Sequence, residues 1–248
     1  MTHEGKVAIV TGAGSGFGAG TARKFIEAGA QVVVAELNED AGRKVAAELG
    51  DGALFVKADV TKEADLAASV DAAIRAFGRV DVFVNNAGYT HRAKSFADIT
   101  EEEFDRVFKV NVWAPMRSIA HLLPHFEKQG GGVVINICSV GGLRPRPNLA
   151  AYSSSKGAAI TLTKALAIEL APKNIRVCGI NPVLGATGML ADFLGDNALE
   201  RRAQFEATIP LGRFAEPADI GNAAVFLSSD AASLITGTIL DVDGGRTI

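Results

Sequence analysis

Cysteine is scarce in this sequence: its 248 residues include only Cys138 and Cys178. Both lie in apolar, β-like runs, and they do not form the spaced framework typical of disulfide-rich secreted proteins. We therefore expect buried thiols in a reducing compartment, with a disulfide between them as the weaker alternative. The start of the chain lacks the pattern of a signal peptide, and no apolar run is long enough to cross a membrane. These absences predict a cytoplasmic protein with no membrane partner.

Basic charge is not in excess either. Lys and Arg number 25 against 28 Asp and Glu, and the formal net charge is −3. Because the basic residues are dispersed, we expect no binding to nucleic acid or to an anionic membrane surface. Apolar residues make up 48% of the chain, which is enough for a sizeable buried core. With no internal repeat, low-complexity tract or linker, the sequence predicts one domain over residues 1–248.

Motifs of several other enzyme classes are missing. The sequence contains neither the G-x-S-x-G nucleophile elbow of α/β-hydrolases nor the phosphate-binding loop of nucleotide triphosphatases. His121 and His125 are four residues apart, but no glutamate follows the first histidine and Pro124 lies between them. We interpret this segment as a partly exposed helix end and predict no metal site.

What the sequence does contain is an alternation of short β-branched runs with longer helical patterns. Continuous apolar strands separated by helices are typical of a parallel sheet that is covered on both faces. Right-handed crossovers then give an α/β, doubly wound Rossmann-type fold with a seven-stranded parallel sheet flanked by helices. Helix start signals include a capping box at Thr100 and a first-turn proline at Pro217. The expected strands are 7–10, 32–34, 53–56, 82–84, 133–137, 175–177 and 238–242.

A glycine-rich turn follows the first expected strand. Because that strand ends just before the turn, we assign the working glycines to Gly12, Gly16 and Gly18, although a plain G-x-G-x-x-A search would begin at Gly14. Such glycines let a turn tighten and let backbone N–H groups approach a pyrophosphate at the start of the next helix. The alternative is a flexible glycine-rich loop, against which the preceding strand and the following helix argue.

An acidic residue, Glu36, ends the second expected strand at the distance from the turn that dinucleotide-binding proteins show. A carboxylate at this place accepts hydrogen bonds from the adenosine ribose of NAD and repels the 2′-phosphate of NADP. No basic residue stands at Ser15, Leu37 or Asn38 to bind that phosphate. The sequence therefore predicts NAD as the cofactor, with a merely solvated strand-end charge as the alternative.

Ser139, Tyr152 and Lys156 are the candidate reacting group. Ser139 ends the fifth expected strand, and Tyr152 and Lys156 share one face of a helical stretch because they are four residues apart. A phenol titrates near ~10, too high for an efficient base at neutral pH, and a neighbouring ammonium would stabilise its phenolate. Ser139 would then hold a substrate oxygen while Tyr152 exchanges a proton with it. A Tyr-x-x-x-Lys pair by itself would usually be an exposed helix face.

Together with several other segments, these residues resemble the short-chain dehydrogenase/reductase family. The matches occur in the order and at the spacing of that family, from the first strand to the last, and so cover nearly the whole chain. The matching segments are Thr11-Gly12-x-x-x-Gly16-x-Gly18, Asp59-Val60, Asn85-Asn86-Ala87-Gly88, Asn111, Ser139, Tyr152-x-x-x-Lys156 and Asn181-Pro182.

The resemblance implies a role for each matching residue. It implies that Tyr152 is the general acid/base, that Lys156 lowers the Tyr152 pKa and binds the nicotinamide ribose, and that Ser139 orients the substrate oxygen. Asn111 resembles the family asparagine that kinks a helix and holds a water relaying protons through Lys156. Hydride would pass directly between nicotinamide and the substrate carbon, with no metal. The implied cofactor contacts are Gly12, Ser15, Gly16, Phe17, Gly18, Glu36, Leu37, Asp59, Val60, Asn86, Ala87, Gly88, Tyr152, Lys156, Pro182, Val183 and Thr187.

Within this set, Asp59 and Val60 are expected at the adenine and Thr187 at the nicotinamide carboxamide. The sequence departs from the family pattern at one point, because Val183 stands where a glycine usually follows the Asn-Pro pair. Its β-branched side chain would lie beside the expected nicotinamide position.

The sequence thus predicts an NAD-dependent oxidoreductase that acts on a ketone or a secondary alcohol. We expect a dinucleotide-binding part over about 1–140, a catalytic and substrate part over about 139–248, and a substrate loop over about 185–213. One alternative is an NADPH-dependent 3-oxoacyl-carrier-protein reductase, against which Glu36 argues. The other is a non-catalytic nicotinamide-binding sensor, which would have no need of the candidate reacting group.

Two further expectations concern the surface. Arg144, Arg146, His91 and Arg92 are candidates to bind an anionic substrate group at the pocket rim, with solvent-facing or intersubunit roles as the alternative. The helix that carries Tyr152 has more apolar surface than one face can bury against its own sheet. Since family members commonly pair such helices about two-fold axes, we expect a homotetramer that associates through helices near 104–126 and 152–170 and through the last strand.

Overall fold

Seven parallel strands form one sheet in the order β3-β2-β1-β4-β5-β6-β7. The computed structural model describes residues 2–185, 188, 190–194 and 198–248. The strand order reverses between β1 and β4, and in open α/β sheets the ligand crevice lies at the carboxyl ends of the strands beside such a point. The strands are β1 (Val7–Thr11), β2 (Gln31–Glu36), β3 (Ala53–Lys57), β4 (Val82–Asn85), β5 (Gly132–Ile137), β6 (Ile175–Pro182) and β7 (Ile239–Val242).

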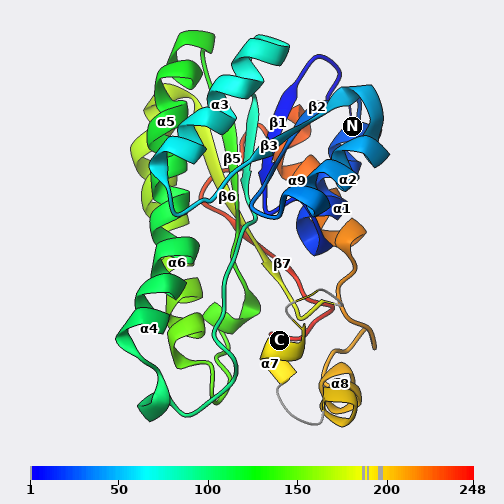
Figure 1. Ribbon diagram of the computed structural model, residues 1–248, viewed down its shortest axis with the longest axis vertical. Helices are drawn as coiled ribbons and strands as arrows, with labels where there is room; N and C mark the ends of the chain where they lie inside the picture. Colours follow the sequence, from blue (N-terminus) through cyan, green and yellow to red (C-terminus); the bar gives the residue numbers. More distant parts are fainter. Residues whose placement is uncertain (1, 186–187, 189, 195–197) are drawn as a thin grey trace.

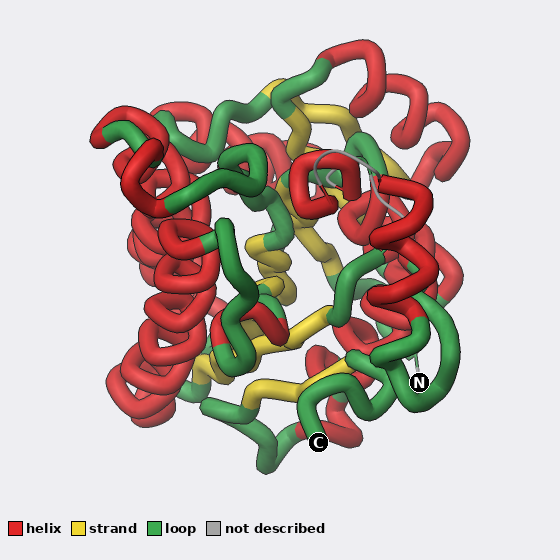
Figure 2. The backbone as a smooth tube through the Cα atoms, turned by 90° about the horizontal axis from the view of Figure 1, so that it is seen from below, coloured by secondary structure: helices red, strands yellow, loops and turns green. Residues whose placement is uncertain are grey.

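Helices cover both faces of this sheet, as Figures 1 and 2 show. One layer contains α1, α2 and α9, and the opposite layer contains α3, α5 and α6, with α4 packed on α6. The doubly wound fold predicted from the sequence is therefore confirmed. The helices are α1 (Gly16–Glu27), α2 (Glu39–Leu49), α3 (Glu63–Phe77), α4 (Glu101–Phe108), α5 (Ala114–Gln129), α6 (Ala150–Leu170), α7 (Leu190–Leu194), α8 (Ala198–Glu206) and α9 (Pro217–Ser228).

Strand β1 shows why the apolar runs are continuous rather than alternating. Ala8 and Val10 pack into the core beneath α1 and α9, whereas Val7 and Ile9 pack into the core beneath α3 and α5. All four are buried because each face of the sheet is covered. Full burial of a large apolar side chain such as Ile9 contributes about 1.5–3 kcal/mol, so both layers stabilise the sheet that carries the site.

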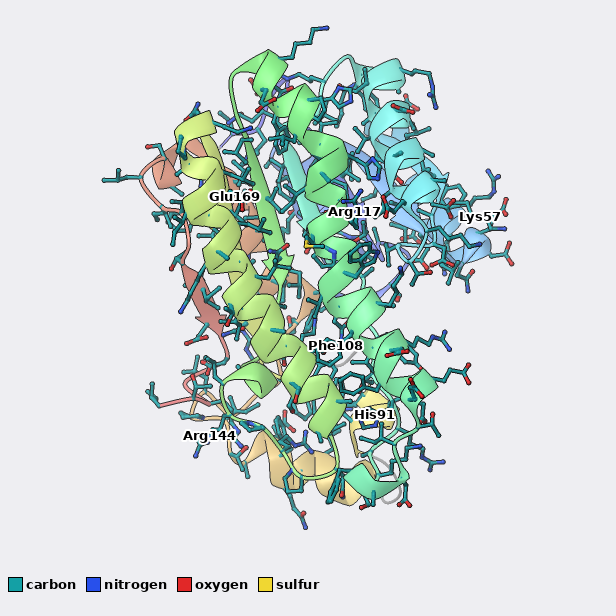
Figure 3. The ribbon with its side chains drawn as sticks, turned by 90° about the vertical axis from the view of Figure 1, so that its left-hand side faces the viewer. Lys57, His91, Phe108, Arg117, Arg144 and Glu169 are labelled. Carbon is teal, nitrogen blue, oxygen red and sulfur yellow. The ribbon has the colours of Figure 1, made fainter. Side chains whose placement is uncertain are left out.

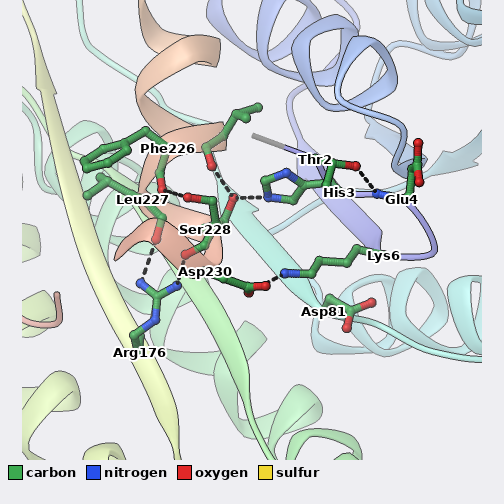
Figure 4. Close-up of polar contacts among 12 residues, drawn as sticks. Thr2, His3, Glu4, Lys6, Asp81, Arg176, Phe226, Leu227, Ser228 and Asp230 are labelled. Atoms are coloured by element: carbon green, nitrogen blue, oxygen red, sulfur yellow. Dashed lines mark hydrogen bonds and ion pairs between the residues drawn. The ribbon is translucent and has the colours of Figure 1, made fainter. Parts of the chain in front are cut away.

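Polar contacts fix the amino-terminal segment to the far end of the sheet (Figure 4). The buried His3 ring forms a 2.9 Å hydrogen bond between its Nε2 and the Ser228 hydroxyl of α9. Lys6 Nζ lies 2.8 Å from Asp230 Oδ1, and Arg176 at the start of β6 donates to the Leu227 carbonyl at 2.6 Å. These bonds attach α9 and the turn after it to the segment before β1 and to the start of β6, at the end opposite the carboxyl ends of the strands.

Some boundaries differ from those predicted. Strand β6 continues to Pro182 instead of ending at residue 177, and β7 begins at Ile239. The expected substrate loop over 185–213 includes two helices, α7 and α8. No helix in the described ranges has both the length and the apolar character needed to cross a membrane.

His121 and His125 are partly exposed, as predicted, but the helix does not end at this segment. Helix α5 continues through Pro124 as far as Gln129. The proline removes a helical hydrogen bond, but Leu122 and Phe126 are fully buried on either side of it and hold the helix against the sheet.

Candidate active site

A large cavity lies at the carboxyl ends of the strands. Its volume of about 1700 Å³ exceeds what one small ligand needs, and suits a dinucleotide together with a substrate. Segments that follow β1 to β7 in the sequence all contribute to its wall. Figure 3 shows two of its lining residues, Phe108 and Arg144, toward the end of the molecule where α8 lies.

The glycine turn between β1 and α1 forms one wall of the cavity. Gly12 and Gly16 adopt φ values of +63° and +52°, which residues with a side chain rarely adopt. A methyl group at Gly18 would lie 2.2 Å from the Gly12 carbonyl oxygen, so only glycine allows this close approach. No described side chain caps the first N–H groups of α1, because the N-cap residue Ser15 makes no such bond. These N–H groups and the helix dipole form an anion site suited to a pyrophosphate.

Residues after β4 hold this turn in place. Asn86 Nδ2 donates to the Thr11 carbonyl at 2.8 Å and to the Gly12 carbonyl at 3.1 Å. In return, the Thr11 hydroxyl accepts hydrogen bonds from the backbone N–H groups of Asn86 and Ala87, both at 3.1 Å. The ends of β1 and β4 are thereby locked together where the strand order reverses. Asn86, Ala87 and Gly88 line the cavity, as predicted.

Glu36 lies at the end of β2 on the same wall. Its Oε2 accepts a hydrogen bond from Gly14 N–H and its Oε1 accepts one from Asn38 N–H, both at 2.9 Å. The carboxylate therefore both supports the glycine turn and faces the cavity, together with Leu37. Its position at the end of β2 fits the ribose of an adenosine rather than a phosphorylated ribose.

Tyr152 and Lys156 stand one turn apart at the start of α6, and both are buried. Ser139 and Tyr152 lie close together, since a methyl group at Gly141 would lie 3.3 Å from Ser139 Oγ and 3.5 Å from Tyr152 Cε1. Lys156 Nζ lies 5.9 Å from the centre of the Tyr152 ring and donates to the Ile137 carbonyl at 2.8 Å. Ser139, Tyr152 and Lys156 all line the cavity.

In the polypeptide by itself, burial has a larger effect on the Tyr152 pKa than any neighbouring charge, and the lowering by Lys156 that the family resemblance implies stays a prediction. Burial raises the pKa of Tyr152 to about 12, and the nearby Ser139 side chain only partly offsets this rise. Burial also lowers the pKa of Lys156. Desolvation disfavours the charged form of both groups, and the spacing of the two residues in the sequence does not reveal it.

Two asparagines position the reacting group from behind. The fully buried Asn181 of β6 accepts from Ser139 N–H at 3.1 Å and donates to Asp241 at 2.8 Å. Sequence reasoning treated Asn181 only as part of the family pattern, although a polar residue within an apolar run would have indicated a buried hydrogen-bonding role. Asn111 lies in a π-helical segment, Lys109–Trp113, between α4 and α5.

Asn111 is buried and does not line the cavity directly. Its side chain exchanges two 2.9 Å hydrogen bonds with the backbone of Tyr89 and donates to Ser155 at 2.9 Å. A methyl group at Gly88 would lie 3.6 Å from Asn111 Oδ1 and 3.7 Å from Lys156 Nζ, so all three residues meet there. The predicted interruption of the helix is found, whereas the proton relay stays a prediction.

The cavity brings together nearly all of the expected cofactor contacts. The exception is Thr187, which lies outside the described residues. His91 and Arg92 are not among the described lining residues, and His91 is buried. Phe193 and Phe205 also line the cavity, and both lie within the expected substrate loop. Sequence reasoning did not indicate Arg246 and Thr247, because no local motif marks them and only the tertiary fold brings them to the cavity.

A doubly wound sheet with a glycine turn at its switch point, and a Ser-Tyr-Lys group on the same cavity, define a dinucleotide-dependent oxidoreductase. A family profile described as enoyl-(acyl carrier protein) reductase matches residues 12–247. The chain belongs to the short-chain dehydrogenase/reductase family, which confirms the family and the oxidoreductase class predicted from the sequence.

Relatives align over almost their entire length. The chain is 50% identical to 4-formylbenzenesulfonate dehydrogenase of Comamonas testosteroni, with all of both chains covered. It is 40% identical to 7alpha-hydroxysteroid dehydrogenase of Escherichia coli K12, over 98% of this chain and 94% of that one. The crystal structure of 3-ketoacyl-(acyl-carrier-protein) reductase from Brucella melitensis complexed with NADH superposes with a TM-score of 0.94, at 48% identity and 99% coverage of each chain.

Proposed function

We propose that this protein is an NAD(H)-dependent dehydrogenase that interconverts a carbonyl compound and its alcohol. The observation that carries this proposal is that Ser139, Tyr152 and Lys156 line the same cavity as the glycine turn and Glu36. The nicotinamide, when bound, accepts or supplies the hydride. The anion site at the start of α1 and the carboxylate of Glu36 would hold the pyrophosphate and the adenosine ribose.

The chain's own residues move the proton. Ser139 donates a hydrogen bond to the substrate oxygen and orients it toward Tyr152. Because burial keeps the phenol protonated, Tyr152 is ready to donate its proton to the oxygen during carbonyl reduction. In alcohol oxidation, Tyr152 accepts that proton, and the ammonium of Lys156 stabilises the resulting phenolate. Asn111 positions Tyr89 and Ser155 rather than contacting the reacting atoms.

The relatives suggest two kinds of substrate. The name of the Comamonas relative describes an aromatic aldehyde with a sulfonate group, and the Escherichia coli relative acts on a hydroxysteroid. The Brucella relative favours a second candidate function, reduction of a 3-oxoacyl group attached to a carrier protein. Its NADH complex supports our choice of NAD over NADP for this chain.

The test is turnover of the purified protein, followed by NADH absorbance. Substrates should include aromatic aldehydes, hydroxysteroids, and acetoacetyl-CoA as a mimic of the carrier-bound substrate. We expect turnover of an aldehyde, ketone or alcohol with NAD(H). Exclusive turnover of acetoacetyl-CoA would favour the second candidate, whereas NADH binding without any turnover would indicate a sensor and overturn the proposal.

We also propose a cytoplasmic homotetramer. Phe104 of α4 and Ile168 of α6 are 44% and 79% exposed, and these two helices pack on each other. Exposed apolar side chains on the outer helices of one layer are typical of a surface that another subunit covers. The two cysteines are free and buried, which supports a reducing compartment.

A further inference from the structure

Three arginines, Arg144, Arg146 and Arg246, line one end of the cavity together with Phe205 of α8. The guanidinium carbon of Arg146 lies 4.7 Å from the centre of the Phe205 ring, and that of Arg246 lies 5.5 Å from it. A ring attracts each guanidinium, but two cations beside one ring also repel each other. This end of the cavity, here called the arginine cluster, therefore concentrates positive charge.

The chain holds the arginine cluster in a fixed arrangement. Arg144 Nη1 donates to the Arg246 carbonyl at 2.8 Å, and Arg144 N–H donates to the Val140 carbonyl at 2.8 Å, directly after Ser139. Asp243 fixes the remaining carboxyl-terminal residues by accepting from Gly245 N–H at 2.9 Å and from Thr247 N–H at 2.8 Å. The cluster is thus tied to the segment that carries the candidate catalytic serine.

Protein carboxylates do not neutralise this charge fully. Within the described ranges, neither Arg144 nor Arg246 forms an ion pair, and Arg246 Nε is buried without a hydrogen-bond partner. A buried donor without a partner is costly unless a ligand accepts from it. The acidic residues that line the cavity come from the ends of β2 and β3 and from α4, whereas the arginines follow β5 and β7 in the sequence. These acidic residues are Glu36, Asp59, Glu101, Glu102 and Asp105.

We propose that the arginine cluster binds a carboxylate or sulfonate at the far end of the substrate while the carbonyl group lies at Ser139 and Tyr152. Planar guanidinium groups suit such anions because two N–H groups can donate to two oxygens of the anion. Phe193, whose ring lies 5.0 Å from the Tyr152 ring, lines the cavity with Phe205 and offers an apolar wall for the intervening carbon skeleton. This inference rests on the proposed dehydrogenase function and names its substrate class.

The experiment compares an anionic substrate, 4-formylbenzoate, with its neutral analogue, 4-methylbenzaldehyde, by kcat/KM with NADH. Because hydrogen bonds to charged groups are strong, we expect Arg246→Gln and Arg146→Gln each to reduce kcat/KM for the anionic substrate about 10- to 100-fold. The value of kcat/KM for the neutral aldehyde should not change. Turnover of the neutral aldehyde also shows whether each variant is folded. Arg246→Lys, which keeps the charge but not the planar fork, should lose less.

A matched control is Arg202→Gln on α8. The Arg202 guanidinium carbon lies 5.4 Å from the centre of the Phe214 ring, and the residue is not among the described lining residues. This variant should keep the wild-type preference for the anion. Equal kcat/KM for both aldehydes in the wild type would overturn the inference and leave the proposed function intact. The inference would also be wrong if Arg246→Gln weakened NADH binding as much as it weakened use of the anion.

If neither aldehyde reacts, the proposed activity toward this substrate class fails, and calorimetry still decides the inference. Benzoate and benzenesulfonate are then titrated into the protein in the presence of NADH. The anion site would be supported if Arg246→Gln weakened the binding of these probes and Arg202→Gln did not. Absence of binding by both probes would overturn it.

Discussion

Replacing Glu36 by glutamine should reduce the preference for NADH over NADPH. The Glu36 carboxylate is fixed by two backbone N–H donors, those of Gly14 and Asn38, both at 2.9 Å. It therefore cannot swing away to make room for a 2′-phosphate. Glutamine keeps the shape of the side chain and removes its negative charge. It can accept from only one of the two donors, because its NH2 group replaces the other oxygen.

The magnitude follows from Coulomb's law. Two unit charges about 4 Å apart repel each other by about 1 kcal/mol in water and about 4 kcal/mol at the effective dielectric constant near a protein surface. Because Glu36 is half-buried, we take about 2 kcal/mol, which corresponds to roughly 30-fold in discrimination. Glu36→Ala should lower kcat/KM with NADH further than Glu36→Gln does, since it also removes the support of the glycine turn.

The assay measures kcat/KM for NADH and for NADPH with the same series of substrate concentrations. Glu39→Gln is the matched control, because Glu39 pairs with Arg43 at 2.8 Å outside the cavity and should not affect cofactor choice. Equal use of NADH and NADPH by the wild type would refute the reasoning. So would a Glu36→Gln variant whose ratio of kcat/KM values is unchanged.

Three other predictions concern the turn, stability and assembly. Gly18→Ala should lose about 1–3 kcal/mol of stability and most of its NADH affinity, because the added methyl would lie 2.2 Å from the Gly12 carbonyl oxygen. In the control Gly157→Ala, the added methyl makes an ordinary 3.5 Å contact, so stability and NADH affinity should stay as in the wild type. Thermal denaturation measures the stability, and fluorescence titration measures the NADH affinity. Burial lowers the pKa of His3 below its usual 6.5, so its stabilising contribution is present above that pH and is lost as pH falls through the folded-state value. Urea denaturation across this range should therefore show a flatter pH dependence for His3→Gln than for the wild type, and parallel curves would contradict the assignment. Light scattering should give four times the mass of one chain, and the mass of a single chain would exclude the tetramer.

Much of the fold could be predicted because its signals are local. Strands such as β1 and β5 are apolar except for Thr11 and Asn136, and this pattern follows from burial on both faces of the sheet. The glycine turn could be placed because the conformations and close contacts that require glycine all fall within one short segment. The reacting group could be proposed because Tyr152 and Lys156 lie on the same helix and need no long-range contact to share a face.

Features that depend on packing could not be predicted. Strand β6 includes Asn181 and Pro182, which local propensity excludes from a strand, but Asp241 and Ser139 satisfy the asparagine across the sheet. Helix α5 tolerates Pro124 because its neighbours are buried. The raised pKa of Tyr152 depends on desolvation. Contact between Arg246 and Phe205 depends on the path of the carboxyl-terminal segment, which no local motif indicates.

The most direct test of the proposed mechanism is the turnover of Tyr152→Phe, measured together with its NADH affinity. This substitution removes only the hydroxyl that exchanges the proton and keeps the ring that contacts Phe193. We expect NADH to bind as it does to the wild type while kcat falls about 100-fold or more. A variant that binds NADH and retains most of the wild-type kcat would show that Tyr152 is not the general acid/base.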